Sequence, residues 1–570
     1  MKLGIRILNV SGLLLFFKLF SCAQPLNQKK IYTKQDTLRG SINANRDWWD
    51  VQQYGLEIMP DILTKTIKGI NTVHFLVVKG GRNKKMQIDL QAPMKMDSII
   101  WNNKIFRSFK RSGNTYILDF ANYKFIDTSD KKVPQKILQS VSLKCYFSGK
   151  PREAIRPPWQ GGWIWEKDEL GRPWITVACQ GLGASVWYPC KDHQSDEPDK
   201  GATISITVPD SLSAVANGRL INKEPKKKGT TIWTWQVKNP INNYNIVPYI
   251  GKYTYWSENF IGETEKNLSL DYWVLDYNLE KAKKQFSRDV KPMLTAFEYW
   301  FGPYPFYDDG FKLVESPYLG MEHQSAIAYG NHYLNGYLGS DLSGSGWGLK
   351  WDYIIIHESG HEWFGNNITT NDIADMWVHE GFTMYSEVLF TEYLYGKEAA
   401  NEYAQGLQRG ISNNIPVIGP YGVNKEGSGD MYNKGACLIH MIRQIINNDS
   451  IFRKILRGLN IDFFHKTINS KEVEQYINSK SGINFSKMFD QYLRTKQVPV
   501  LEYKIEGKTL RYRWTNCVKD FDMPVYSYYG KNRQLIKPTQ EWANQFFGNW
   551  IEAKEFRLDE NFYIKSKKIN

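Results

Sequence analysis

Two histidines, with a glutamate directly after the first, are the strongest chemical signal in the sequence. His357 and His361 lie four residues apart, and Glu358 stands between them. On a helix, residues four apart lie one above the other, so both imidazoles can reach one metal ion while Glu358 faces a position beside it. The pattern therefore predicts one zinc ion per chain, with Glu358 as the general base that takes a proton from an activated water.

A carboxylate further along the chain completes the expected ligand set. Catalytic zinc takes three protein ligands and keeps a fourth position for water, and Glu380 is the predicted third ligand. A histidine ligand six residues after His361 is excluded, because Phe364 and Asn367 occupy the glycine and histidine positions of that pattern. The alternative is a pair of ordinary polar histidines on an exposed helix, but the apolar run at 353–356 favours a buried one.

The spacing of apolar residues divides the chain into β-rich and helical regions, which must position these residues. Apolar and polar residues alternate between turns from about residue 48 to residue 252, which predicts a β-rich region. Helical spacing begins near residue 256, and alternation returns from residue 498 as expected for a small β-sandwich. The expected strands are 54–58, 72–78, 86–90, 203–208 and 311–315, and the expected helices are 279–301, 432–447, 450–459, 471–480 and 485–495.

Length and composition agree with a multidomain α+β protein. At 570 residues the chain exceeds what one core supports. We expect a signal peptide at 1–23, an N-terminal β domain at 24–255, a zinc catalytic domain at 256–497 and a C-terminal β-sandwich at 498–570. The net charge of +14 is dispersed apart from the lysines at 226–228, which favours solubility over nucleic-acid binding. No Cys-x-x-Cys pair supports a zinc finger or a thioredoxin site, and the sequence leaves open whether Cys179 and Cys190 form a disulfide.

The first residues predict export. Lys2 and Arg6 precede an apolar run at 7–20, which is typical of a secretory signal, so the mature chain should begin near Gln24. Cys22 is a candidate lipid anchor, because its surroundings loosely match a lipoprotein cleavage box. No later segment has the ~20 apolar residues that cross a bilayer. The expected location is periplasmic or extracellular, free or membrane-anchored.

Five short motifs, in order along the chain, resemble the aminopeptidase N family of zinc exopeptidases, which are gluzincins and include leukotriene-A hydrolase. The motifs are Phe-Gly-Pro-Tyr-Pro-Phe at 301–306, Gly-Met-Glu-His at 320–323, Trp-Phe-Gly-Asn at 363–366, Trp-Val-His-Glu-Gly-Phe at 377–382 and Tyr-Asn-Lys-Gly at 432–435. The resemblance covers nearly the whole mature chain. It implies a saddle-like β domain, a thermolysin-like and mainly helical catalytic domain, and a C-terminal β-sandwich.

The resemblance also implies roles for individual residues. Tyr432 corresponds to the catalytic tyrosine, whose hydroxyl we expect to stabilise the oxyanion. Glu322 corresponds to the acid that binds the free α-amine of the substrate, and Gly320 and Met321 belong to the same signature. Gln180 corresponds to a residue of the β domain that helps to hold the amine.

This chain departs from the family pattern at three positions near the expected amine site. Leu319 replaces a glycine, His323 replaces an asparagine, and Leu182 replaces the second polar residue of the motif that begins with Gln180. On the ligand side, Glu387 lies seven residues after Glu380 and so on the same helix face. We expect it to orient a ligand histidine.

Together these features predict a secreted zinc aminopeptidase that hydrolyses the N-terminal bond of peptides with a free N-terminus. A thermolysin-like endopeptidase is an alternative with the same chemistry, but it has no use for the segment 320–323 or for the Lys-Gly pair after Tyr432. A catalytically inactive peptide-binding relative is a further alternative. The intact ligands, base and tyrosine argue against it.

Overall fold

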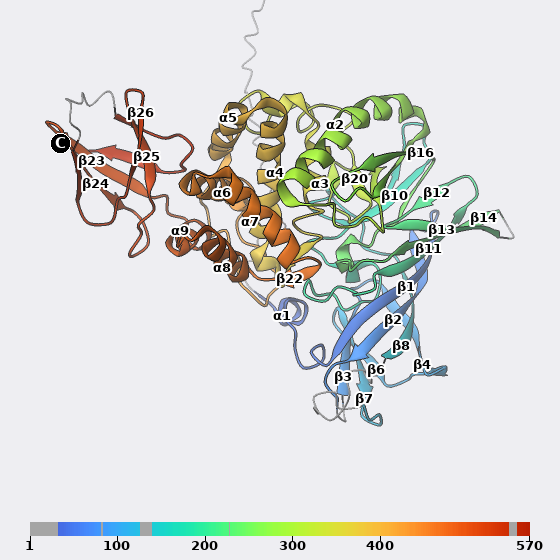
Figure 1. Ribbon diagram of the computed structural model, residues 1–570. Coiled ribbons are helices and arrows are strands. Elements are labelled where there is room, and N and C mark those ends of the chain that lie inside the picture. Colours follow the sequence, from blue (N-terminus) through green and yellow to red (C-terminus); the bar gives the residue numbers. More distant parts are fainter. Residues whose placement is uncertain (1–31, 81–83, 126–139, 227–228, 547–555, 570) are drawn as a thin grey trace, which may run out of the picture.

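The computed structural model describes residues 32–80, 84–125, 140–226, 229–546 and 556–569 (Figure 1). The expected multidomain α+β fold is confirmed: a β-rich N-terminal region, a mainly helical centre and two C-terminal sheets follow one another along the chain. Figure 1 shows the helices between the two β-rich ends. The predicted signal peptide and Cys22 lie outside the described residues.

An eight-stranded sheet dominates the N-terminal region, in the order β13-β14-β11-β1-β2-β8-β4-β5. Its strands are β1 (Trp49–Asp61), β2 (Thr66–Val77), β4 (Lys95–Trp101), β5 (Lys104–Ile105), β8 (Ser140–Gly149), β11 (Ala202–Pro209), β13 (Arg219–Lys226) and β14 (Thr230–Val237). Buried and half-buried residues alternate strictly along β14, because successive side chains of a strand point to opposite faces. The alternation read from the sequence therefore reflects one buried face.

Two smaller sheets complete this region. A four-stranded sheet has the order β12-β15-β10-β9 and a three-stranded sheet the order β3-β7-β6, and both contribute side chains to the same buried cluster as the large sheet. Their strands are β3 (Lys84–Asp89), β6 (Phe109–Ser112), β7 (Thr115–Phe120), β9 (Gly162–Lys167), β10 (Pro173–Ala178), β12 (Ser213–Val215) and β15 (Tyr249–Gly251). A short helix, α1 (Lys34–Gly40), precedes β1. Cys179 and Cys190 are buried free thiols, not a disulfide.

The central region combines a five-stranded sheet with the helices. The sheet has the order β16-β17-β18-β20-β19 and consists of β16 (Tyr253–Ile261), β17 (Asn267–Leu275), β18 (Phe311–Glu315), β19 (Gly320–Met321) and β20 (Ile327–Tyr329). The helices are α2 (Leu279–Phe301), α3 (Tyr353–Gly360), α4 (Trp377–Tyr395), α5 (Lys397–Leu407), α6 (Asn433–Ile446), α7 (Asp449–Asp462), α8 (Ser470–Ser481) and α9 (Ser486–Arg494). The strands β21 (Ile368–Thr370) and β22 (Lys466–Ile468) pair in parallel.

Most of the helices expected from periodicity lie within a few residues of their observed bounds, and α2 matches its predicted range. The sequence did not predict α5. Its buried face consists largely of alanines, together with Tyr403 and Leu407, so its hydrophobic signal is weak. Among the described residues, no helix is both long enough and apolar enough to cross a membrane.

Two sheets form the C-terminal region. The four-stranded sheet has the order β27-β24-β23-β29 and the three-stranded sheet the order β26-β25-β28. Their strands are β23 (Val500–Glu506), β24 (Thr509–Thr515), β25 (Val525–Tyr529), β26 (Asn532–Ile536), β27 (Ala543–Phe546), β28 (Phe556–Leu558) and β29 (Lys565–Lys568). They attach to the helices through polar contacts such as His440 Nε2 to Asn561 Oδ1 at 3.0 Å.

Two large clusters of buried apolar side chains meet at the central sheet. One includes the residues of the β-rich region, and the other joins the helices to the C-terminal sheets. Along the segment β18 to β20, Val314 and Met321 belong to the first cluster, whereas Leu313 and Ile327 belong to the second. This segment is therefore held from both sides, which fixes the position of the residues that follow β19.

Candidate active site

The histidine pair lies on a short, fully buried helix. Asp352 caps α3, because its side chain accepts hydrogen bonds from the backbone N–H groups of Ile354 and Ile355. The helix ends at Gly360, but His361 keeps right-handed helical angles of φ −64° and ψ −20°. The spacing of four residues therefore still places both imidazoles on one side, with His357 one turn before His361.

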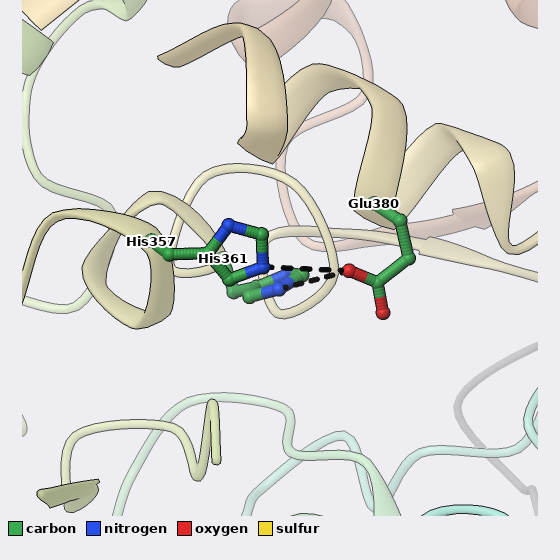
Figure 2. A group of neighbouring side chains, drawn as sticks. All are labelled: His357, His361 and Glu380. Atoms are coloured by element: carbon green, nitrogen blue, oxygen red, sulfur yellow. Dashed lines mark ion pairs between the residues drawn. The ribbon is translucent and has the colours of Figure 1, made fainter. Parts of the chain in front are cut away.

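Glu380 meets the two imidazoles from the first turn of α4 (Figure 2). Its Oε2 atom lies 3.6 Å from His357 Nε2 and 3.3 Å from His361 Nε2. All three side chains are buried, and their ligand atoms lie within 4.8 Å of one another. No hydrogen-bond donor among the described residues satisfies Glu380 Oε2. A buried carboxylate oxygen without a donor is costly, so this set of two nitrogens and one oxygen fits a zinc ion.

The opposite ring nitrogens of the two histidines face acceptors. His357 Nδ1 lies 2.7 Å from Glu387 Oε1, and His361 Nδ1 lies 3.0 Å from the carbonyl oxygen of Phe364. Tyr403 of α5 donates to Glu387 Oε2 at 2.6 Å. A proton on Nδ1 leaves the Nε2 lone pair free, so these contacts orient both rings for metal binding. The sequence indicated Glu387, but gave no sign of Tyr403.

Two glycines allow Tyr432 to lie close to the predicted zinc ligands. Tyr432 precedes the first residue of α6, and its ring centroid lies 5.9 Å from that of His357. A Cβ atom on Gly435 would lie 2.9 Å from the Cα atom of Gly381, so only glycines allow α4 and α6 to cross so closely. Burial raises the pKa of Tyr432 well above 10, and the carboxylates of Glu380, Glu322 and Glu358 add to this effect. The hydroxyl therefore stays protonated.

Glu358 is buried beside the predicted zinc ligands. Burial raises the pKa of its carboxyl to about 7; the two imidazoles oppose this effect, and Glu322 and Glu380 add to it. A Cβ atom on Gly320 would lie 2.9 Å from Glu358 Oε1, which explains why a glycine stands at this point of β19.

Glu322 directly follows β19 and faces the same site. Ligand atoms of Glu322, Glu358 and His361 lie within 4.8 Å of one another. Its Oε1 atom accepts hydrogen bonds from Gln180 Nε2 at 2.5 Å and from Tyr244 OH at 2.8 Å. Burial is the main reason why the pKa of Glu322 is raised. The sequence indicated Gln180 through the resemblance, but it missed Tyr244, which lies in a short 3-10 turn without a recognisable motif.

The three departures from the family pattern differ in position. Leu319 lines the cavity. His323 is fully buried, its Nδ1 atom lies 2.7 Å from Tyr249 OH, and burial lowers its pKa to about 3. Leu182 packs against the core of the β-rich region. The backbone at Glu322 is also held by Asn366 Nδ2, which donates to the Glu322 carbonyl at 2.9 Å.

A cavity that is open to solvent joins these groups. Its wall includes His357, Glu358, His361, Glu380, Tyr432, Glu322, Gly320, Met321 and Gln180, together with Trp159, Met376, Glu426 and Met431. The nine residues predicted from the sequence to bind zinc, to catalyse the reaction or to bind substrate therefore all lie around one cavity.

This arrangement of two histidines, a distant glutamate and an adjacent base fits a zinc site of the gluzincin type. Residues 277–492 match the profile of the peptidase family M1 domain. This match agrees with the resemblance of the five sequence motifs to the aminopeptidase N family.

Several aminopeptidases are similar to this chain in sequence, and solved M1 metallopeptidases are similar to it in fold. Aminopeptidase B of Mus musculus is 26% identical over 366 residues, which cover 59% of this chain and 52% of that protein. Probable aminopeptidase 1 of Saccharolobus solfataricus is 22% identical over 495 residues, which cover 84% of this chain and 58% of that protein. An M1 zinc metallopeptidase mutant from Deinococcus radiodurans, bound to a Tyr-Ser-Ala substrate, has a similar fold, with a TM-score of 0.63 at 18% identity over 80% of this chain and 96% of that one. The chain spans about half the length of the curated relatives named here.

Proposed function

We propose that this protein is a zinc aminopeptidase that releases the first residue from peptides with a free N-terminus. The observation that carries the proposal is the position of Glu322. Its carboxylate shares the cavity with the candidate zinc ligands, and a ligand atom lies within 4.8 Å of those of Glu358 and His361. An anion so close to the reacting groups limits cleavage to the bond next to a bound ammonium group.

In this proposal His357, His361 and Glu380 hold the zinc ion. When bound, zinc supplies Lewis acidity to a water molecule and to the scissile carbonyl. Glu358 takes the proton from the attacking water and returns it to the leaving amine. Burial raises the pKa of its carboxyl, which helps this group to accept a proton and then to return it.

Tyr432 stabilises the negative charge that develops on the carbonyl oxygen. Its hydroxyl remains protonated because burial and the surrounding carboxylates raise its pKa. A positioned donor of this kind typically contributes about a hundredfold to the rate.

Glu322 binds the α-ammonium group of the substrate. Gln180 and Tyr244 both donate to Oε1, which leaves Oε2 for the substrate. A buried ammonium without a counter-charge costs several kcal/mol, so the free N-terminus needs the carboxylate of Glu322. A peptide with an acetylated N-terminus has no cation to pair with Glu322 and should bind poorly at this site.

The test compares an alanine anilide with its N-acetylated form, with and without a zinc chelator, alongside the zinc content per chain. We expect cleavage of the free form alone, its loss with chelator and its recovery on adding zinc. Equal cleavage of both forms would favour the endopeptidase alternative. Zinc binding without any turnover would favour the inactive peptide-binding alternative.

We also propose that the protein is exported to the periplasm or the outside of the cell. The support is the arrangement of Lys2 and Arg6 before the apolar run at 7–20. Cys22 remains the candidate lipid anchor. N-terminal sequencing of the mature protein, with labelled fatty acid in the growth medium, would separate a free chain that begins near Gln24 from a lipidated one that begins at Cys22.

A further inference from the structure

The wall of the active-site cavity is strongly acidic. Among the described residues that line it are the carboxylates of Glu322, Glu358, Glu380 and Glu426, and none of these lining residues is a lysine or an arginine. The first three have roles in the proposed mechanism. Glu426 has none, although a buried acid is costly to maintain.

Glu426 is buried and only partly satisfied. The residue is 5% exposed, and its Oε1 atom has no hydrogen-bond donor among the described residues. Lys425 Nζ lies 3.9 Å from that oxygen, which is too far for a hydrogen bond. Burial raises the pKa of Glu426 to about 7, and Lys425 opposes this effect. A donor supplied by a ligand would therefore find an acceptor that is already desolvated.

The backbone around Glu426 is fixed by close packing. A Cβ atom on Gly427 would lie 1.9 Å from the carbonyl oxygen of Val417, and Ser428 N donates to the carbonyl of Pro416 at 2.9 Å. Gly419 N donates to the carbonyl of Ala374 at 2.9 Å, which ties this loop to the segment before α4. The carboxylate is thus held in the cavity wall and does not sit on a free loop.

We infer that Glu426 is a specificity-determining residue that binds the cationic side chain of an N-terminal arginine or lysine. This inference rests on the proposed aminopeptidase function. With the α-ammonium at Glu322 and the scissile carbonyl near Tyr432, the first side chain of the substrate must lie in the same cavity. The apolar side chains of Met376 and Met431 line that cavity as well. They suit the aliphatic stem of a long basic side chain, whose charged end then meets Glu426.

The test uses anilides of arginine, citrulline, lysine, methionine and alanine. Citrulline has the shape of arginine without its charge, so this pair isolates the charge without any mutation. The wild-type protein should have a kcat/KM for arginine at least tenfold above that for citrulline, as expected for one charge-assisted hydrogen bond. In Glu426→Gln, the kcat/KM for the arginine and lysine anilides should fall about ten- to hundredfold. The kcat/KM for the methionine and alanine anilides should change less than about threefold. Glu398→Gln, an exposed acid on α5, is the matched control and should change nothing.

Several outcomes would overturn the inference. Equal rates for arginine and citrulline in the wild-type protein would do so even if the Glu426 variant failed to fold. If kcat/KM of the Glu426→Gln variant fell equally for all five substrates, or fell for none of them, a role in specificity would also be excluded. A preference for arginine at the second position, measured with the dipeptides Arg-Ala and Ala-Arg, would mean that Glu426 contacts the residue after the scissile bond. If no free aminoacyl anilide is cleaved, the proposed function fails instead.

Discussion

Replacing Gly435 by alanine should disturb the catalytic site without touching any of its functional side chains. The added Cβ atom would lie 2.9 Å from the Cα atom of Gly381. Carbon atoms in ordinary contact are about 3.5 Å or more apart, so α4 and α6 must separate by roughly half an ångström. Glu380 directly precedes Gly381, and Tyr432 lies one turn before Gly435, so the separation should pull these two groups apart.

The size of the effect follows from two known costs. Forcing an extra methyl group into a packed contact costs about 1–3 kcal/mol of stability, and a misplacement of about 1 Å in an active site can cost roughly a hundredfold in rate. For half that displacement we expect kcat to fall about tenfold and the melting temperature to fall by a few degrees. The assays are kcat on alanine anilide, zinc per chain and thermal unfolding.

The matched control is Gly55→Ala in β1. There the added Cβ atom would lie 3.4 Å from the Cβ atom of Thr72, which is close to the ordinary contact distance, and Gly55 lies outside the cavity wall. If Gly435→Ala keeps its kcat within twofold, its zinc and its melting temperature, then the close crossing of α4 and α6 does not position the site, and the reasoning is wrong.

Three further predictions test single contacts. In steady-state kinetics, Tyr432→Phe should lower kcat about a hundredfold with little change in KM, because the lost hydroxyl acts on the oxyanion. A change in KM alone would contradict this role. Tyr244→Phe removes the 2.8 Å hydrogen bond to Glu322 Oε1 and should raise KM about tenfold for free aminoacyl anilides, whereas a merely structural role would lower stability and leave KM unchanged. Burial lowers the pKa of His440 to about 4, so the unfolded chain takes up this proton at a higher pH than the folded protein. The free energy of unfolding should therefore fall by up to about 3 kcal/mol as the pH drops from 6.5 towards 4; His440→Gln should flatten this slope in urea titrations, and an equal slope in both proteins would refute the assignment.

Local periodicity explains why so much could be predicted from the sequence. The spacing of His357 and His361 places them on one helix face whatever the rest of the chain does, and the range of α2 follows from its repeating apolar residues. These features depend on the geometry of 3.6 residues per turn, which acts over neighbouring residues. The alternation along β14 reflects the period of two in the same way.

The tertiary structure alone decided which residues from distant segments meet. Gln180 and Tyr244 reach Glu322 across 142 and 78 residues of sequence. Gly381 and Gly435 matter only because two helices cross there. Glu426 has no motif, and it became noticeable only through its burial, its unpaired oxygen and its place in the cavity wall. Close approach and desolvation depend on how whole elements pack, so no short stretch of sequence encodes them.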